Sequence, residues 1–105
     1  MYHLKIQNQI NKMNKIEKLT LIEGDFSFDE AKEILINMYS SKINFHTMQN
    51  LSSQERFGID DEMAQKRIPL LRNEMKKLEE ILLEAKAKNK KLVVNSEINI
   101  SLTDD

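Results

Sequence analysis

Residues 64–85, AQKRIPLLRNEMKKLEEILLEA, decide the fold that this sequence predicts. Their apolar side chains recur at alternating steps of four and three residues, a heptad pattern that places them along one face of an α-helix. The positions are Ala64, Ile68, Leu71, Met75, Leu78, Leu82 and Ala85. Leu70 and Ile81 flank this face, so its apolar surface is wide enough to contact more than one neighbouring helix.

Pro69 lies about two turns into this predicted helix. A proline there removes one backbone hydrogen bond and crowds the carbonyl four residues earlier. Either the helix bends at Pro69, or residues 61–67 form a separate turn and the long helix begins at Pro69. We favour a kink, because the heptad continues through Pro69 in phase.

An earlier helix is predicted to begin at Ser27. Ser27 and Glu30 have the spacing of a capping box, in which each side chain binds the backbone amide of the other residue. Leu35 widens a stripe of residues at helical spacing, and this stripe predicts a helix to about Asn50. The stripe consists of Ala31, Ile34, Met38, Ser41, Phe45 and Met48.

Residues 51–58, most of which are polar, interrupt this period and are predicted to connect the two helices. Ser52 and Glu55 fit a second capping box, and Gly58 permits a turn. Asp60 or Asp61 is the expected cap of the second helix.

Two strands are predicted to flank the helices. Residues 18–23 are mostly aliphatic or β-branched and end at Gly24. After Asn89 the period becomes two, and the apolar side chains of residues 92–102 alternate with polar ones. The sequence therefore predicts a mainly α fold with a small β component (α+β), in the order β-α-α-β. Its core is a long antiparallel helical hairpin, with two strands antiparallel to each other.

We expect a polar tail or weak helix at residues 1–17, followed by a single domain over residues 18–105. The chain has 105 residues, no cysteine and a net charge of -1, with 40% hydrophobic residues. These totals predict a folded, water-soluble protein. They exclude disulfides and thiolate metal sites, and they disfavour a phosphate-backbone binder.

No cofactor is expected. The sequence shows no apolar run long enough to cross a membrane and no apolar core of a signal peptide, so the expected location is cytoplasmic. Lysine, isoleucine and asparagine are abundant, while there are only two glycines and one proline. This bias is typical of an AT-rich coding sequence and indicates a bacterial or phage source.

The candidate partner or ligand site is the tip of the predicted hairpin, residues 46–61. Its members are His46, Glu55, Arg56, Asp60 and Asp61. Arg56 could bind a carboxylate or phosphate, with the histidine and the acids around it. Ordinary turn and capping chemistry explains the same residues and is the favoured interpretation. No zinc, EF-hand or nucleophile-elbow pattern is present, so neither a metal site nor an enzyme is expected.

Lys86, Lys88, Lys90 and Lys91 form a basic cluster that could bind nucleic acid. Lysines also collect at helix C-termini because the helix dipole is negative there, and we favour this explanation.

Two helices and two strands leave apolar surface without an evident cover. We therefore expect a homodimer, and the alternative is a monomer whose strands fold across the hairpin. The candidate interface residues are Leu70, Ile81, Ile98, Ile100 and Leu102. The favoured function is a cytoplasmic, non-enzymatic protein–protein interaction module that self-associates. The alternatives are a nucleic-acid-associated accessory protein using residues 86–91 and a small-ligand or metal site at residues 46–61.

Overall fold

A computed structural model describes residues 16–104. The elements are β1 (Glu17–Phe26), α2 (Phe28–Phe57), α3 (Glu62–Ala87) and β2 (Leu92–Ile100). The fold is 63% helix and 21% strand in the predicted β-α-α-β order, so the predicted fold class is confirmed. Residues 1–15, where a tail or weak helix is predicted, lie outside the described residues. The described residues divide into two compact units, residues 25–92 and residues 16–24 together with 93–104.

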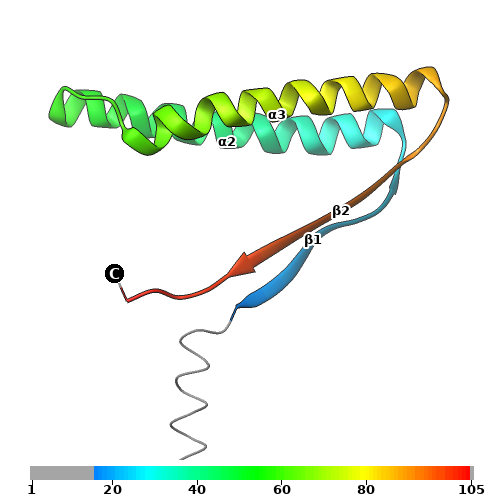
Figure 1. Ribbon diagram of the computed structural model, residues 1–105, viewed down its shortest axis with the longest axis horizontal. Helices are drawn as coiled ribbons and strands as arrows, with labels where there is room; N and C mark the ends of the chain where they lie inside the picture. The colour runs from blue at the N-terminus through cyan, green and yellow to red at the C-terminus, as the bar shows by residue number, and fades with distance from the viewer. Residues whose placement is uncertain (1–15, 105) are drawn as a thin grey trace, which may run out of the picture. The chain divides into compact units, whose positions relative to one another are not determined.

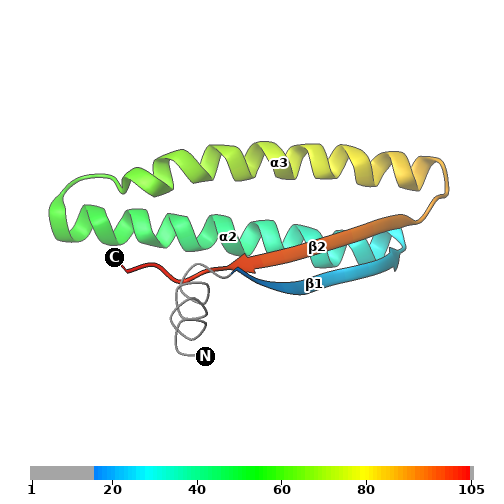
Figure 2. The ribbon, with the colours of Figure 1, turned by 60° about the horizontal axis from the view of Figure 1, so that its bottom comes forward.

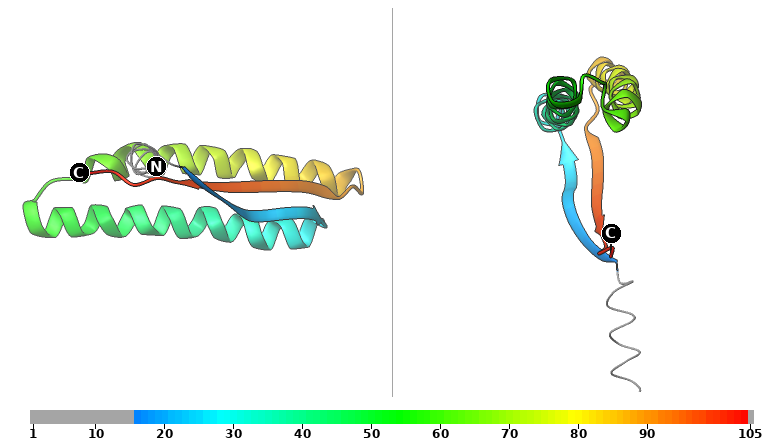
Figure 3. Two further views of the ribbon diagram at one scale, coloured as in Figure 1. Left: turned by 90° about the horizontal axis from the view of Figure 1, so that it is seen from below. Right: turned by 90° about the vertical axis from the view of Figure 1, so that its left-hand side faces the viewer.

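The first unit is a hairpin in which α2 and α3 run side by side in opposite directions (Figure 1). Its seam is the line along which the two helices face each other (Figure 3). The buried residues of α3 are Ala64, Leu71 and Leu82, all members of the predicted heptad. The other four members are half-buried, so the predicted face of α3 is its buried face.

The predicted capping box at the start of α2 is confirmed. Ser27 Oγ accepts a hydrogen bond of 3.2 Å from the Glu30 amide, and the Ser27 amide donates one of 2.9 Å to Glu30 Oε1. The bond from the Ser27 backbone is the main reason that the pKa of Glu30 lies below its ordinary value of 4.5. A lowered folded-state pKa means that this interaction stabilises the protein above pH 4.5. The contribution is lost as the pH falls through the folded-state pKa.

Replacing Ser27 with alanine should lower the free energy of unfolding by about 1 kcal/mol, because the Glu30 amide loses its acceptor. Urea unfolding followed by circular dichroism measures this change. Ser53→Ala is the control, because Ser53 lies inside α2. Equal losses from both variants would contradict a specific role for the cap.

The predicted end of α2 near Asn50 is wrong, because the helix continues to Phe57. Gly58 ends it with φ of 70°, in the left-handed region that glycine adopts without strain, and its amide donates to the Gln54 carbonyl. Ser52 and Glu55 are therefore interior helical residues and do not form a capping box. Residues 51–57 contain neither glycine nor proline, so their polar side chains leave the backbone hydrogen-bond ladder intact.

Helix α3 begins at its cap Asp61, whose Oδ2 accepts from the Ala64 amide at 2.9 Å. Of the two caps predicted for this helix, Asp61 is the one used. The helix continues through Pro69 to Ala87, so a separate turn ending before Pro69 is wrong. The kink at Pro69 stays a prediction.

Strands β1 and β2 form a two-stranded antiparallel sheet (Figure 2). β1 is longer than predicted because it passes through Gly24, which adopts a φ of 152°. β1 has 10 residues and β2 has 9, so the last strand is not the longer one that the predicted ranges 18–23 and 92–102 imply. The predicted alternation holds from Leu92 to Glu97, where even-numbered residues are the less exposed ones.

Candidate functional site

The hairpin has a groove on one of its sides, near the end where α2 begins and α3 finishes. The groove has a volume of about 320 Å³. It is lined by Phe28, Lys32, Ile36, Glu79, Leu82 and Leu83. The Nζ atoms of Lys32 and Lys86 lie 5.7 and 4.9 Å from the centre of the Phe28 ring, within the range of a cation–π interaction. We call this side of the hairpin the groove side.

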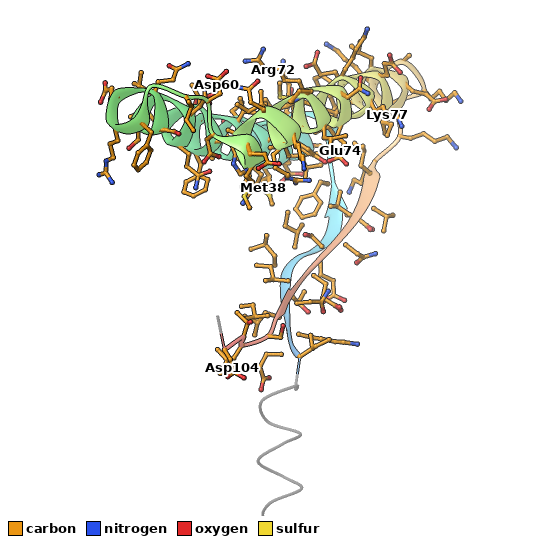
Figure 4. All side chains as sticks on the ribbon, turned by 60° about the vertical axis from the view of Figure 1, so that its left-hand side comes forward. Met38, Asp60, Arg72, Glu74, Lys77 and Asp104 are labelled. Atoms are coloured by element: carbon orange, nitrogen blue, oxygen red, sulfur yellow. The ribbon has the colours of Figure 1, made fainter. Side chains whose placement is uncertain are left out.

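The opposite side of the hairpin follows from helix geometry. Residues two apart lie about 200° apart around a helix. Ile34 therefore points away from Ile36, and Ile81 points away from Leu83, so both lie opposite the groove. Figure 4 shows this division further along the hairpin, with Met38 and Glu74 on one side and Arg72 and Asp60 on the other.

The side opposite the groove carries large apolar side chains from both helices, and we call it the apolar side. Leu70 and Ile81 of α3 are each 53% exposed, and Met63 is also exposed. Met63 and Leu70 are 7 positions apart, and Leu70 and Ile81 are 11 positions apart. At about 100° per residue, all three side chains therefore point within about 20° of the same direction. From α2 come Ile34, Met38 and Phe45, of which Phe45 is exposed and the other two are half-buried.

This arrangement corrects the predicted stripe of α2. Phe45 and Met48 were expected in the seam, but both are exposed, and the seam contains Ile43 and His46 instead. His46 is only 4% exposed, and its Nδ1 lies 3.0 Å from Gln49 Oε1. In this half of α2 the buried face includes the polar residue His46. The apolar spacing therefore predicted a different face of the helix, the one that carries Phe45 and Met48.

The five candidate residues of the segment 46–61 do not come together. His46 lies within α2, about three turns before its end, and Glu55 and Arg56 are exposed on the last turns. The side chains of Glu55 and Arg56 make no hydrogen bond or ion pair within residues 16–104. Asp60 accepts from Gln54 Nε2 at 2.6 Å, while Asp61 caps α3.

Asn50 ties the connection between the helices to α2. Its Oδ1 accepts from the Asp61 amide at 2.7 Å, and its Nδ2 donates to Asp60 Oδ1 at 3.4 Å. These bonds give both aspartates structural roles. In the part of the chain that the structure describes, no group of three or more His, Asp or Glu side chains is placed to hold a metal ion.

The lysine cluster lies at the C-terminal end of α3 and just beyond it. Lys86, Lys90 and Lys91 line a hollow of about 540 Å³ next to Ser27 and Phe28. Lys88 is paired with Glu84 at 3.0 Å, four residues earlier on the helix. Nucleic-acid binding by this cluster stays a prediction.

The remaining interface candidates lie on or after β2. Ile98, Ile100 and Leu102 are all exposed. Together with Leu70 and Ile81 on the hairpin, all five candidate interface residues keep solvent-accessible apolar surface in the single chain.

No match to this chain is found among protein-family models, curated proteins or solved structures. Neither helix of residues 16–104 has the apolar length that a membrane span requires.

Proposed function

We propose that this protein is a small, cytoplasmic, non-enzymatic protein–protein interaction module, and that it self-associates through the apolar side of its hairpin. The observation that carries the proposal is the exposed apolar surface that both helices contribute to that side. Contiguous exposed apolar surface is characteristic of protein–protein contact sites.

The packing of the hairpin explains why this surface is left over. Each helix uses one face for the seam, and α3 has a second apolar stripe about a quarter turn away from that face. Leu70 and Ile81 lie on this stripe, and each remains 53% exposed to water in the single chain. A partner could bury the rest of each side chain. Full burial of a Leu or Ile side chain contributes about 1.5–3 kcal/mol, and an apolar partner would supply the part of it that the remaining exposure represents.

A second hairpin is a suitable partner for such a surface. Two hairpins packed through their apolar sides form a four-helix bundle, in which every helix has two neighbours. The two-faced apolar pattern of α3 is the pattern that a helix with two neighbours requires.

Ile81→Glu should abolish self-association, because it replaces an aliphatic side chain that association would bury with a carboxylate that would lose its hydration. The measurement is the melting temperature over a hundredfold range of protein concentration. The melting temperature of the unmodified dimer rises with concentration, because association stabilises the folded state by mass action. For Ile81→Glu it should not change with concentration.

Leu83→Glu is the matched control, since Leu83 is similarly exposed but lies on the groove side. This variant should keep the concentration dependence of the unmodified chain. The proposal is wrong if the unmodified chain melts at one temperature throughout the range, or if the two variants behave alike.

A further inference from the structure

One stripe of α3 is complementary to itself. Beginning at Arg67, six exposed residues follow steps of three and four along the apolar side. The stripe consists of Arg67, Leu70, Glu74, Lys77, Ile81 and Glu84. If the order of these six residues is reversed and compared with the original order, every cation coincides with an anion. Each of the two aliphatic residues then coincides with the other one.

This symmetry favours one way of packing two copies of α3. In an antiparallel pair centred between residues 75 and 76, Leu70 of one copy lies opposite Ile81 of the other. Glu74 then faces Lys77, and Arg67 faces Glu84. A two-fold axis makes each of these contacts occur twice, as in any interface that uses the same patch on both subunits.

A parallel, in-register pair would be unfavourable. Each residue would then face its own copy, so Arg67, Glu74, Lys77 and Glu84 would all meet like charges. Like-charge juxtaposition opposes association, whereas the antiparallel arrangement replaces all of these contacts with opposite charges.

Within residues 16–104, three of the four charged residues of the stripe have no ion-pair partner. Arg67 and Lys77 have no carboxylate partner within residues 16–104, where the ion pairs are Glu62–Lys66 and Glu84–Lys88. Glu74 accepts a hydrogen bond of 3.3 Å from the Tyr39 hydroxyl, and no cation among the described residues is paired with it. In the antiparallel pair Glu74 gains Lys77 of the second copy, and Arg67 joins the exposed pair of Glu84 and Lys88.

We propose that two copies of this chain associate by antiparallel packing of α3 against α3, with Leu70 opposite Ile81 and Glu74 opposite Lys77. This inference rests on the proposed self-association and adds the surface, the orientation and the register. The two layers of Leu70 and Ile81 supply apolar burial, and the ionic layers between and beyond them select the antiparallel orientation.

Cysteine cross-linking tests the register, and the natural absence of cysteine makes it specific. Two full-length variants, Leu70→Cys and Ile81→Cys, are tagged differently, mixed and oxidised. A disulfide needs Cα atoms closer than about 7 Å, which opposed residues of packed helices satisfy. Two copies of residue 70 would be about 16 Å apart along the antiparallel pair, since each residue advances the helix by about 1.5 Å.

The mixture should yield mainly the mixed disulfide, and each variant alone should cross-link at least about tenfold less. Leu83→Cys mixed with either variant is the control and should not cross-link. Dominant 70–70 and 81–81 products would overturn the orientation. A dimeric mass without cross-links would overturn the register and leave self-association standing, whereas a monomeric mass would overturn the proposed function as well.

Discussion

Replacing Leu82 with alanine should lower the free energy of unfolding by about 2 to 5 kcal/mol. Leu82 is only 2% exposed and is the largest fully buried side chain of the described residues. The substitution removes three carbon atoms from the seam, and two rigid helices close only partly around the resulting cavity. Urea unfolding at a fixed protein concentration measures the change.

The neighbouring residue supplies a matched control. Leu83 is 62% exposed, so Leu83→Ala removes the same atoms from a position that already contacts water. Its effect should stay below about 1 kcal/mol. Similar losses from the two variants would show that the seam does not pass through Leu82.

Enlarging Ala64 to leucine should also destabilise the hairpin, by about 1 to 3 kcal/mol. Ala64 has no exposed surface, and its amide is bound to the Asp61 cap. Three additional carbons at this point must push α2 and α3 apart close to their connection. The measurement is again urea unfolding, with Ala87→Leu as the control because Ala87 is exposed at the last position of α3. A stable Ala64→Leu variant would indicate unfilled space between the helices.

The sequence predicted the parts of the fold that have strong local signals. The α3 heptad is apolar over its whole length, so its buried face could be assigned from the spacing alone. The capping box at Ser27 places hydrogen-bonding groups at a fixed spacing, and it marked the first residue of α2 correctly. Strand alternation after Asn89 gave the position of β2 to within two residues.

The face of α2 could not be predicted in the same way. Its seam continues from Ile43 through His46, a residue that hydrophobic periodicity does not count. The apolar residues Phe45 and Met48 lie on another side of the helix, and because they are apolar the prediction assigned them to the buried face. Periodicity identifies apolar faces, but it does not distinguish a seam within the chain from a surface for a partner.

The end of α2 was missed for a related reason. Residues 51–57 are mostly polar, which indicated a connection, but polarity alone does not stop a helix. Gly58 is the actual stop, because its left-handed conformation lets its amide close the last turn. Consequently the candidate residues Glu55 and Arg56 belong to a helix and not to a loop.

Only part of the apolar side could be anticipated. Leu70 and Ile81 were predicted as surplus apolar residues because they flank a seam that was already complete. Met63 could have been added, since it is 7 residues before Leu70 and therefore on the same helix face. Assigning Phe45 to this side required the structure, because it depends on which face of α2 meets α3.

Sedimentation equilibrium of the unmodified protein tests most directly whether the apolar side of the hairpin holds two copies of the chain together. The experiment covers protein concentrations from about 1 to 100 μM, the range in which a moderately stable dimer forms. We expect a mass that reaches twice the 12.3 kDa of one chain at the upper end of this range. A mass of 12.3 kDa at every concentration would contradict it.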